Sequence, residues 1–128
     1  MSQVLLIEPD RLLAKTYESA IKGAGHKVNV AGSSQAAINI ASKVAPDIVV
    51  LEIQLIEHSG IEFLYEFRSY SDWQDIPVLM HTNVPYFEFR DGWTLLDRGL
   101  GVSAYKYKPV TNLEELVSTI GELVKSGD

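Results

Sequence analysis

Short, uninterrupted apolar runs alternate along this chain with segments whose apolar residues recur at helical spacing, and this alternation restricts the fold most strongly. Three runs rich in Val, Ile and Leu are continuous, at residues 4–7, 48–51 and 77–80. Continuous apolar strands are typical of parallel sheets that are covered by helices on both faces. Residues 26–31 alternate instead, with Val28 and Val30 on one side, which predicts an edge strand.

The segments between these runs carry apolar residues at offsets of three, four and seven, which place each set on one face of a helix. The sets are Leu13, Tyr17, Ala20 and Ile21; Ala37, Ile40, Ala41 and Val44; and Leu113, Leu116, Val117, Ile120 and Leu123. Gly23 and Gly25 indicate a helix end. Ser33, Ser34 and Asn112 are candidate N-caps. Five strand–helix units predict a doubly wound α/β fold, with a five-stranded parallel sheet and five helices.

Size and composition favour an ordinary globular protein with one domain, residues 1–128. The net charge of -6 and the lack of a basic run argue against direct binding to nucleic acid or to an anionic membrane. The absence of cysteine excludes disulfides, thiolate nucleophiles and cysteine-ligated zinc, and it fits a reducing compartment. The N-terminus lacks a basic region and reaches Glu8 too soon for a signal peptide. We therefore expect a cytoplasmic location.

Polar side chains follow the apolar runs, at the strand ends where sites lie in doubly wound sheets. They are Glu8 and Asp10 after the first run, Glu52 after the second, Thr82 after the third, and Lys108 followed by Pro109 after the last predicted strand. Buried acids cost several kcal/mol unless they are paired. We therefore expect Glu52 and Lys108 to lie within ion-pair distance of each other.

Taken together, these motifs resemble the receiver domain of bacterial two-component response regulators of the chemotaxis-regulator type. The matching motifs are "IEPD", "PDIVVLEIQL" with Gly60 closing the following loop, "IPVLMHT" and "GVSAYKYKP". In this order and spacing the set is specific, and it covers essentially the whole chain. The resemblance implies a flavodoxin-like strand order, 2-1-3-4-5.

The resemblance also implies a role for each strand-end residue. Glu52 stands where receivers carry an aspartate that accepts a phosphoryl group from a histidine kinase, with magnesium held by the acids after the first strand. Thr82 and Lys108 are the equivalents of the residues that bind the phosphoryl oxygens, and Tyr105 matches an aromatic residue that swings inward and outward. Partners such as a histidine kinase or an effector would bind through the face of helix 4, strand 5 and helix 5.

Two departures from the family pattern affect the expected chemistry. Glu52 is longer than aspartate by one methylene, which moves the carboxylate outward by roughly 1.5 Å. Pro9 replaces an acid and offers no ligand to a magnesium ion. We therefore expect a pseudo-receiver that works by protein binding, without enzymatic activity, cofactor or conventional aspartyl phosphorylation. A magnesium ion at Glu8, Asp10 and Glu52 is the weaker alternative.

Other interpretations stay open at this stage. Glu52 and Lys108 could be a relic ion pair kept for stability, or Glu52 could be a working but atypical phosphoacceptor. A small flavodoxin-like ligand-binding protein is a further alternative, although no glycine-rich phosphate loop follows the first strand.

The segment of residues 83–101 is the least family-like part of the chain. Tyr86, Phe89, Trp93 and Leu96 form a stripe that favours core packing, with an exposed patch for a partner as the alternative. Gly92 makes a regular helix there less favourable. His58 and His81 are isolated, so we expect structural roles for both.

Overall fold

The computed structural model describes residues 2–127, which form a five-stranded parallel sheet in the order β2-β1-β3-β4-β5. The strands are β1 (Gln3–Ile7), β2 (Lys27–Ala31), β3 (Ile48–Leu51), β4 (Val78–Thr82) and β5 (Val102–Tyr107). The α-helices are α1 (Arg11–Gly23), α2 (Ser34–Lys43), α3 (Gly60–Ser69) and α4 (Leu113–Gly127). Shorter helical segments are η1 (Ser71–Trp73), η2 (Tyr86–Gly92), η3 (Leu95–Gly99) and η4 (Lys108–Val110). The predicted doubly wound fold and its strand order are confirmed, and β2 is an edge strand as expected.

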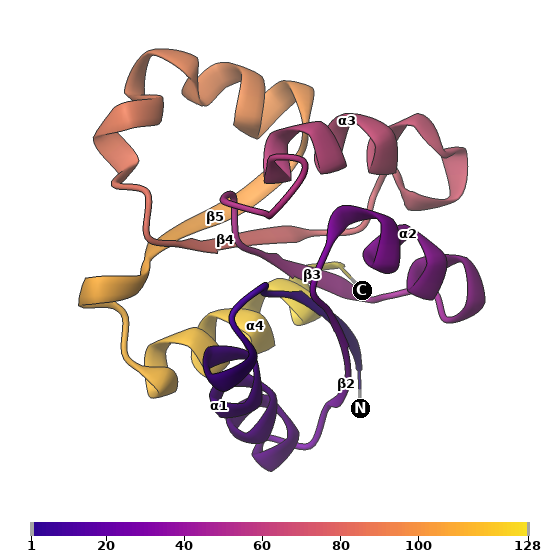
Figure 1. Ribbon diagram of the computed structural model, residues 1–128, viewed down its shortest axis with the longest axis vertical. Coiled ribbons are helices and arrows are strands. Elements are labelled where there is room, and N and C mark those ends of the chain that lie inside the picture. Colours follow the sequence, from indigo (N-terminus) through magenta and orange to yellow (C-terminus); the bar gives the residue numbers. More distant parts are fainter. Residues whose placement is uncertain (1, 128) are drawn as a thin grey trace.

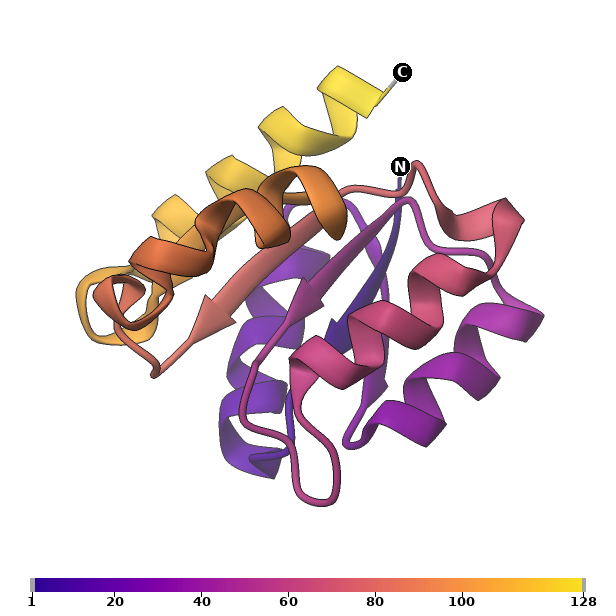
Figure 2. The ribbon, with the colours of Figure 1, turned by 90° about the horizontal axis from the view of Figure 1, so that it is seen from above.

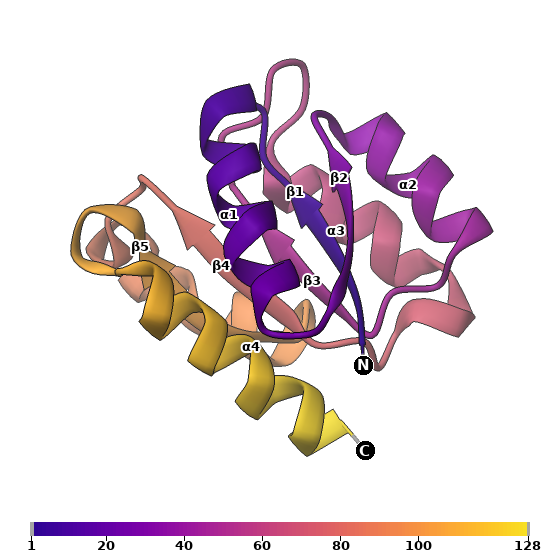
Figure 3. The ribbon, with the colours of Figure 1, turned by 90° about the horizontal axis from the view of Figure 1, so that it is seen from below.

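Helices cover both faces of the sheet, which explains why its inner strands are uninterrupted apolar runs. Helices α1 and α4 lie side by side on one face, and α2 and α3 lie on the other (Figures 1 and 3). The segment η2–η3 lies on the same side as α2 and α3, above β4 and β5 (Figure 2). Two apolar clusters result, one on each face of the sheet.

The predicted caps are largely confirmed. The Ser33 hydroxyl accepts a hydrogen bond from the backbone N–H of Ala36, and Asn112 accepts one from Glu115 at 2.7 Å. Ser34 is instead the first residue inside α2. Val44, predicted on the core face, is 39% exposed because it follows the last turn of α2 in an extended conformation.

The helix predicted after β4 is not a regular α-helix, because only Trp93 and Thr94 in its middle are α-helical. The η2 segment is a 3₁₀-helix, and η3 is a π-helical turn in which the backbone N–H of Leu100 donates to Leu95 O at 2.8 Å. A 3₁₀-helix has three residues per turn, so Tyr86 and Phe89 lie on the same side. The core-packing prediction holds fully only for Leu96, which is buried, whereas Tyr86 is 43% exposed.

No helix within residues 2–127 is both long enough and apolar enough to cross a membrane.

Candidate functional site at the carboxyl ends of the strands

The register of the parallel sheet brings four of the predicted site residues to one edge. Glu8 extends β1, because its backbone N–H donates to Ala31 O at 3.0 Å. Glu52 extends β3 in the same way, donating to Ile7 O at 3.0 Å. Thr82 ends β4 and pairs with Tyr107, the last residue of β5, so that Lys108 follows at the same level.

The ammonium group of Lys108 lies between two buried carboxylates. Its Nζ is 2.5 Å from Glu8 Oε1 and 2.8 Å from Glu52 Oε1. The three side chains are only 6%, 3% and 4% exposed, in the order Lys108, Glu8, Glu52. The predicted pairing of Glu52 with Lys108 is therefore confirmed, and Glu8 shares the same lysine.

Both carboxylate oxygens of Glu52 accept further hydrogen bonds. The Thr82 hydroxyl and the backbone N–H of Gln54 donate to Oε2, the latter at 3.0 Å, and the backbone N–H of Asn83 donates to Oε1 at 3.3 Å. Burial raises the pKa of Glu52, but the hydrogen bonds from Lys108, Thr82 and Gln54 outweigh it and leave the pKa below its usual value. Glu52 is therefore held ionised.

Lys108 is held ionised by the same contacts. Burial lowers the pKa of Lys108, but its hydrogen bonds to Glu52 and Glu8 outweigh burial and raise the pKa above the usual value. The ammonium also lies 5.8 Å from the centre of the Tyr17 ring, within the range of a cation–π contact. Sequence reasoning placed Tyr17 only on the core face of a helix. The sequence feature that could have indicated this role is the polar hydroxyl of Tyr17 on an otherwise apolar helix face.

The two histidines are placed differently. His81 is buried and meets the Tyr17 ring edge to face, with ring centres 4.6 Å apart. Burial, assisted by the positive charge of Lys108, lowers the pKa of His81 to about 4, so the imidazole is neutral at pH 7. His58 is exposed, and its Nδ1 lies 2.9 Å from the Glu62 carboxylate.

Tyr105 connects the site to the irregular helical segment. Its hydroxyl donates to Val84 O at 2.5 Å, just beyond β4. Its ring centre lies 5.4 Å from Tyr86, 6.1 Å from Phe89 and 6.4 Å from Trp93. Burial, and next the negative charge of Glu52, raise the pKa of Tyr105. The tyrosine is thus turned inward, with η2 packed around it.

Gly60 allows the loop after Glu52 to close. Its backbone N–H donates to Ile53 O at 2.6 Å. A Cβ at this position would lie 2.9 Å from both Glu52 O and Ile53 Cα, closer than real Cβ contacts. Only glycine therefore fits where the loop passes the backbone of the site.

The prediction that Asp10 belongs to the acidic pocket is wrong. Asp10 is exposed and caps α1, its carboxylate accepting hydrogen bonds from the backbone N–H groups of Leu12 and Leu13, both at 3.0 Å. The cause is local, because an aspartate directly before a helix finds unpaired N–H groups within reach.

The residues present do not fit a magnesium ion. Lys108 already lies between the two buried carboxylates, the second oxygen of Glu8 accepts from the backbone N–H of Asp10 at 3.1 Å, and Pro9 supplies no ligand. Within residues 2–127, no three acidic or histidine side chains are grouped to hold a metal ion.

Comparison with known proteins identifies the family. Residues 4–120 match the model of the response regulator receiver domain, and the chain belongs to this family. The transcriptional regulatory protein TrcR of Mycobacterium tuberculosis is 32% identical in an alignment of 127 positions that covers 96% of this chain and 45% of that protein. The chain spans about half the length of the curated relatives it matches.

Solved structures share the fold at low sequence identity. A sensor protein from Polaromonas sp. JS666 superimposes with a TM-score of 0.86 at 15% identity, covering 99% of this chain and 98% of that one. The chemotaxis protein CheY4 of Vibrio cholerae gives a TM-score of 0.85 at 23% identity, covering 96% and 98%. These similarities agree with the strand order and the two-layered helix arrangement.

Proposed function

We propose that this receiver-like domain signals by binding a protein partner, without phosphorylation at position 52 and without catalytic turnover. The observation that carries the proposal is the double contact of the Glu52 carboxylate with the Thr82 hydroxyl and the Lys108 ammonium. In the receiver family these two positions bind the oxygens of a phosphoryl group. Glu52 reaches both by itself, although it brings one negative charge where a phosphoryl group brings nearly two.

The inward position of Tyr105 supports a route from this site to a binding surface. The proposed surface is the face made by η2, η3, β5 and α4, which is the helix 4, strand 5 and helix 5 face of the family. Phe87 in η2 is 67% exposed on this face. The ion pair between Lys106 and Glu115, 3.0 Å long, connects β5 with α4. A histidine kinase or an effector protein in the cytoplasm is the kind of partner we propose.

The alternative of a working atypical phosphoacceptor is disfavoured by the surroundings of Glu52. Each of its oxygens already accepts two hydrogen bonds, so neither is free to attack a phosphoryl donor. Metal ions also normally neutralise charge on a transferring phosphoryl group, and the residues here do not suit one.

Labelling with acetyl phosphate and magnesium, followed by intact mass measurement, tests the absence of phosphorylation. We expect no label on the wild type, little on Glu52→Asp, and measurable label only when Pro9→Asp is combined with Glu52→Asp. The double variant restores both an aspartate acceptor and a metal ligand. A phosphate on Glu52 or Asp10 of the wild type would refute the proposal in favour of an atypical acceptor.

A second experiment tests whether Glu52 holds Tyr105 inward. Glu52→Asp shortens the side chain, so we expect loss of the Thr82 or Lys108 contact and a changed NMR environment of the Tyr105 ring. Glu62→Asp makes the same change at an exposed glutamate of α3 and should leave that ring unaffected. An unchanged Tyr105 signal in Glu52→Asp would show that the site and the binding face are not coupled.

A further inference from the structure

A pocket of about 550 Å³ opens beside the strand-end site, against α1. The loops after three strands contribute to it, with Pro9 after β1, Gly32 after β2 and Ile56 after β3. Crevices outside the carboxyl ends of parallel strands are where doubly wound folds bind ligands, and the volume lies in the usual range for small molecules. Apolar side chains of Pro9, Ala14, Val30 and Ile56 form much of its lining.

The charges in this pocket are unevenly compensated. Its two carboxylates have partners, because Glu8 pairs with Lys108 at 2.5 Å and Glu18 pairs with Lys22 at 3.1 Å. Its two cations, Arg11 and Lys15, form no ion pair or hydrogen bond through their side chains within residues 2–127. A protein of net charge -6 therefore presents two cationic side chains without an ion-pair partner among the described residues, beside an apolar lining.

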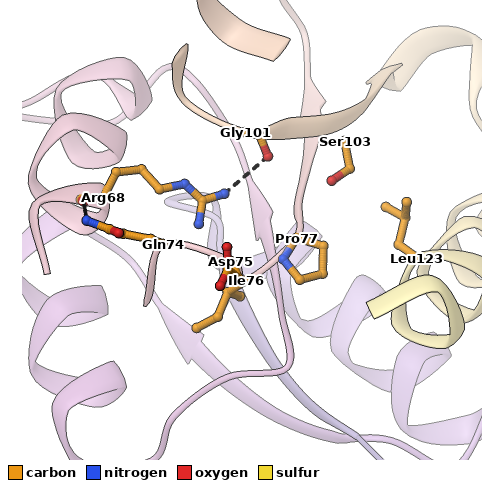
Figure 4. Close-up of a pocket in the computed structure, with 8 residues that line it drawn as sticks. All are labelled: Arg68, Gln74, Asp75, Ile76, Pro77, Gly101, Ser103 and Leu123. Carbon is orange, nitrogen blue, oxygen red and sulfur yellow. Dashed lines mark hydrogen bonds between the residues drawn. The ribbon is translucent and has the colours of Figure 1, made fainter. Parts of the chain in front are cut away.

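A second pocket, of about 330 Å³, differs in that its cationic side chain already has hydrogen-bond partners (Figure 4). Its cation, Arg68 of α3, reaches toward Gly101 and is already used by the fold. The guanidinium donates to the carbonyl oxygens of Trp73, Leu100 and Gly101 at 2.6, 2.8 and 3.1 Å. Asp75 also lines that pocket. Its cation is therefore not available to an anion in the way that Arg11 and Lys15 are.

We propose that the pocket beside α1 binds a small anion that carries an apolar group, such as an alkyl carboxylate or an alkyl phosphate. Arg11 and Lys15 would contact the anionic group, while Ala14, Val30 and Ile56 would cover the apolar part. Ile56 is 79% exposed without a ligand, so covering it removes apolar surface from water. This site goes beyond the proposed signalling function and does not depend on it. Such a ligand would regulate the domain without phosphoryl transfer, because it would contact Pro9 in the loop that follows Glu8.

An NMR titration of the full chain with sodium octanoate tests the proposal. We expect saturable shifts of the backbone amides of Ala14, Gly32 and Ile56. 1-Octanol keeps the hydrocarbon without the charge, and acetate keeps the charge without the hydrocarbon, so each should bind at least roughly tenfold more weakly. Monooctyl phosphate is the parallel arm, and whichever of the two octyl anions binds more tightly identifies the preferred anionic group.

Two variants of equal charge provide the control. Arg11→Gln combined with Lys15→Gln should weaken octanoate binding roughly tenfold or more. Lys27→Gln combined with Arg90→Gln removes the same charge from exposed positions outside the pocket and should leave binding unchanged. The proposal is overturned by the absence of saturable shifts, by equal binding of 1-octanol, or by undiminished binding to the first variant. Its failure would leave the phosphodonor result unaffected.

Discussion

Lys108 is the counter-charge shared by two buried carboxylates, Glu8 and Glu52, so its replacement by methionine should destabilise the protein strongly. The substitution keeps the apolar stem but removes the ammonium that lies 2.5 Å from Glu8 and 2.8 Å from Glu52. Removing one partner of a buried ion pair typically costs about 3–5 kcal/mol, since it leaves an uncompensated buried charge. That loss is a large part of a stability of roughly 5–15 kcal/mol.

The loss should depend on pH. In the wild type, contacts lower the pKa of Glu52 below 4.5, so its stabilising contribution is present above pH 4.5 and lost as pH falls through the folded pKa. In Lys108→Met, burial acts without its compensating lysine and should raise the folded pKa of Glu52 above 4.5. The buried charge of Glu52 then lowers the free energy of unfolding of the variant at pH 7, and this loss becomes smaller as pH falls and the carboxyl group is protonated. The difference in free energy of unfolding between the wild type and Lys108→Met should therefore be smaller at pH 5 than at pH 7.

Urea unfolding at pH 7 and pH 5 measures both effects. Lys106→Met is the control, because Lys106 lies on β5, close before Lys108, and forms a more exposed ion pair with Glu115 of α4. Its loss should cost about 0–1 kcal/mol. Adding Glu52→Gln to Lys108→Met should recover part of the loss, since one stranded charge disappears. The reasoning is refuted if Lys108→Met costs no more than Lys106→Met, or if the effects of Glu52→Gln and Lys108→Met simply add.

Three further results are expected from the same unfolding measurements. The pKa of His81 is about 4 in the folded protein and 6.5 in the unfolded one, so its contribution to the free energy of unfolding is complete above pH 6.5 and is lost as pH falls toward 4. The free energy of unfolding of the wild type should therefore fall between pH 7 and pH 5, and His81→Gln should make that fall smaller by about 2 kcal/mol. An equal fall in both proteins would contradict a neutral buried imidazole. Arg68→Met leaves three backbone carbonyls without their donor and should cost about 2 kcal/mol, with a near-neutral result counting against this role. Tyr105→Phe removes the hydrogen bond to Val84 O, so it should lower the free energy of unfolding by about 1 kcal/mol and shift the tryptophan fluorescence of the folded protein. If stability and fluorescence both stay unchanged, the hydroxyl does not hold Tyr105 in place.

Much of the fold and part of the site follow from the sequence. Uninterrupted apolar runs that alternate with helical periodicity lead to a parallel sheet, because strands covered on both faces need apolar residues at every position. In such a sheet all carboxyl ends meet at one edge. The sequence alone therefore predicts the pairing of Glu52 with Lys108, which are 56 residues apart. The spacing of the motifs carried the resemblance to receiver domains, and with it the strand order.

Only the tertiary structure decided how neighbouring side chains divide these roles. Asp10 is two residues from Glu8, yet one caps a helix and the other reaches Lys108. The position of Tyr17 over that lysine and the 3₁₀ and π geometry of η2 and η3 were likewise undetermined by periodicity. The physical reason is that periodicity reports which face of an element is buried. Hydrogen bonds and ion pairs depend on where the ends of long side chains meet, and packing from several elements sets those positions within an ångström.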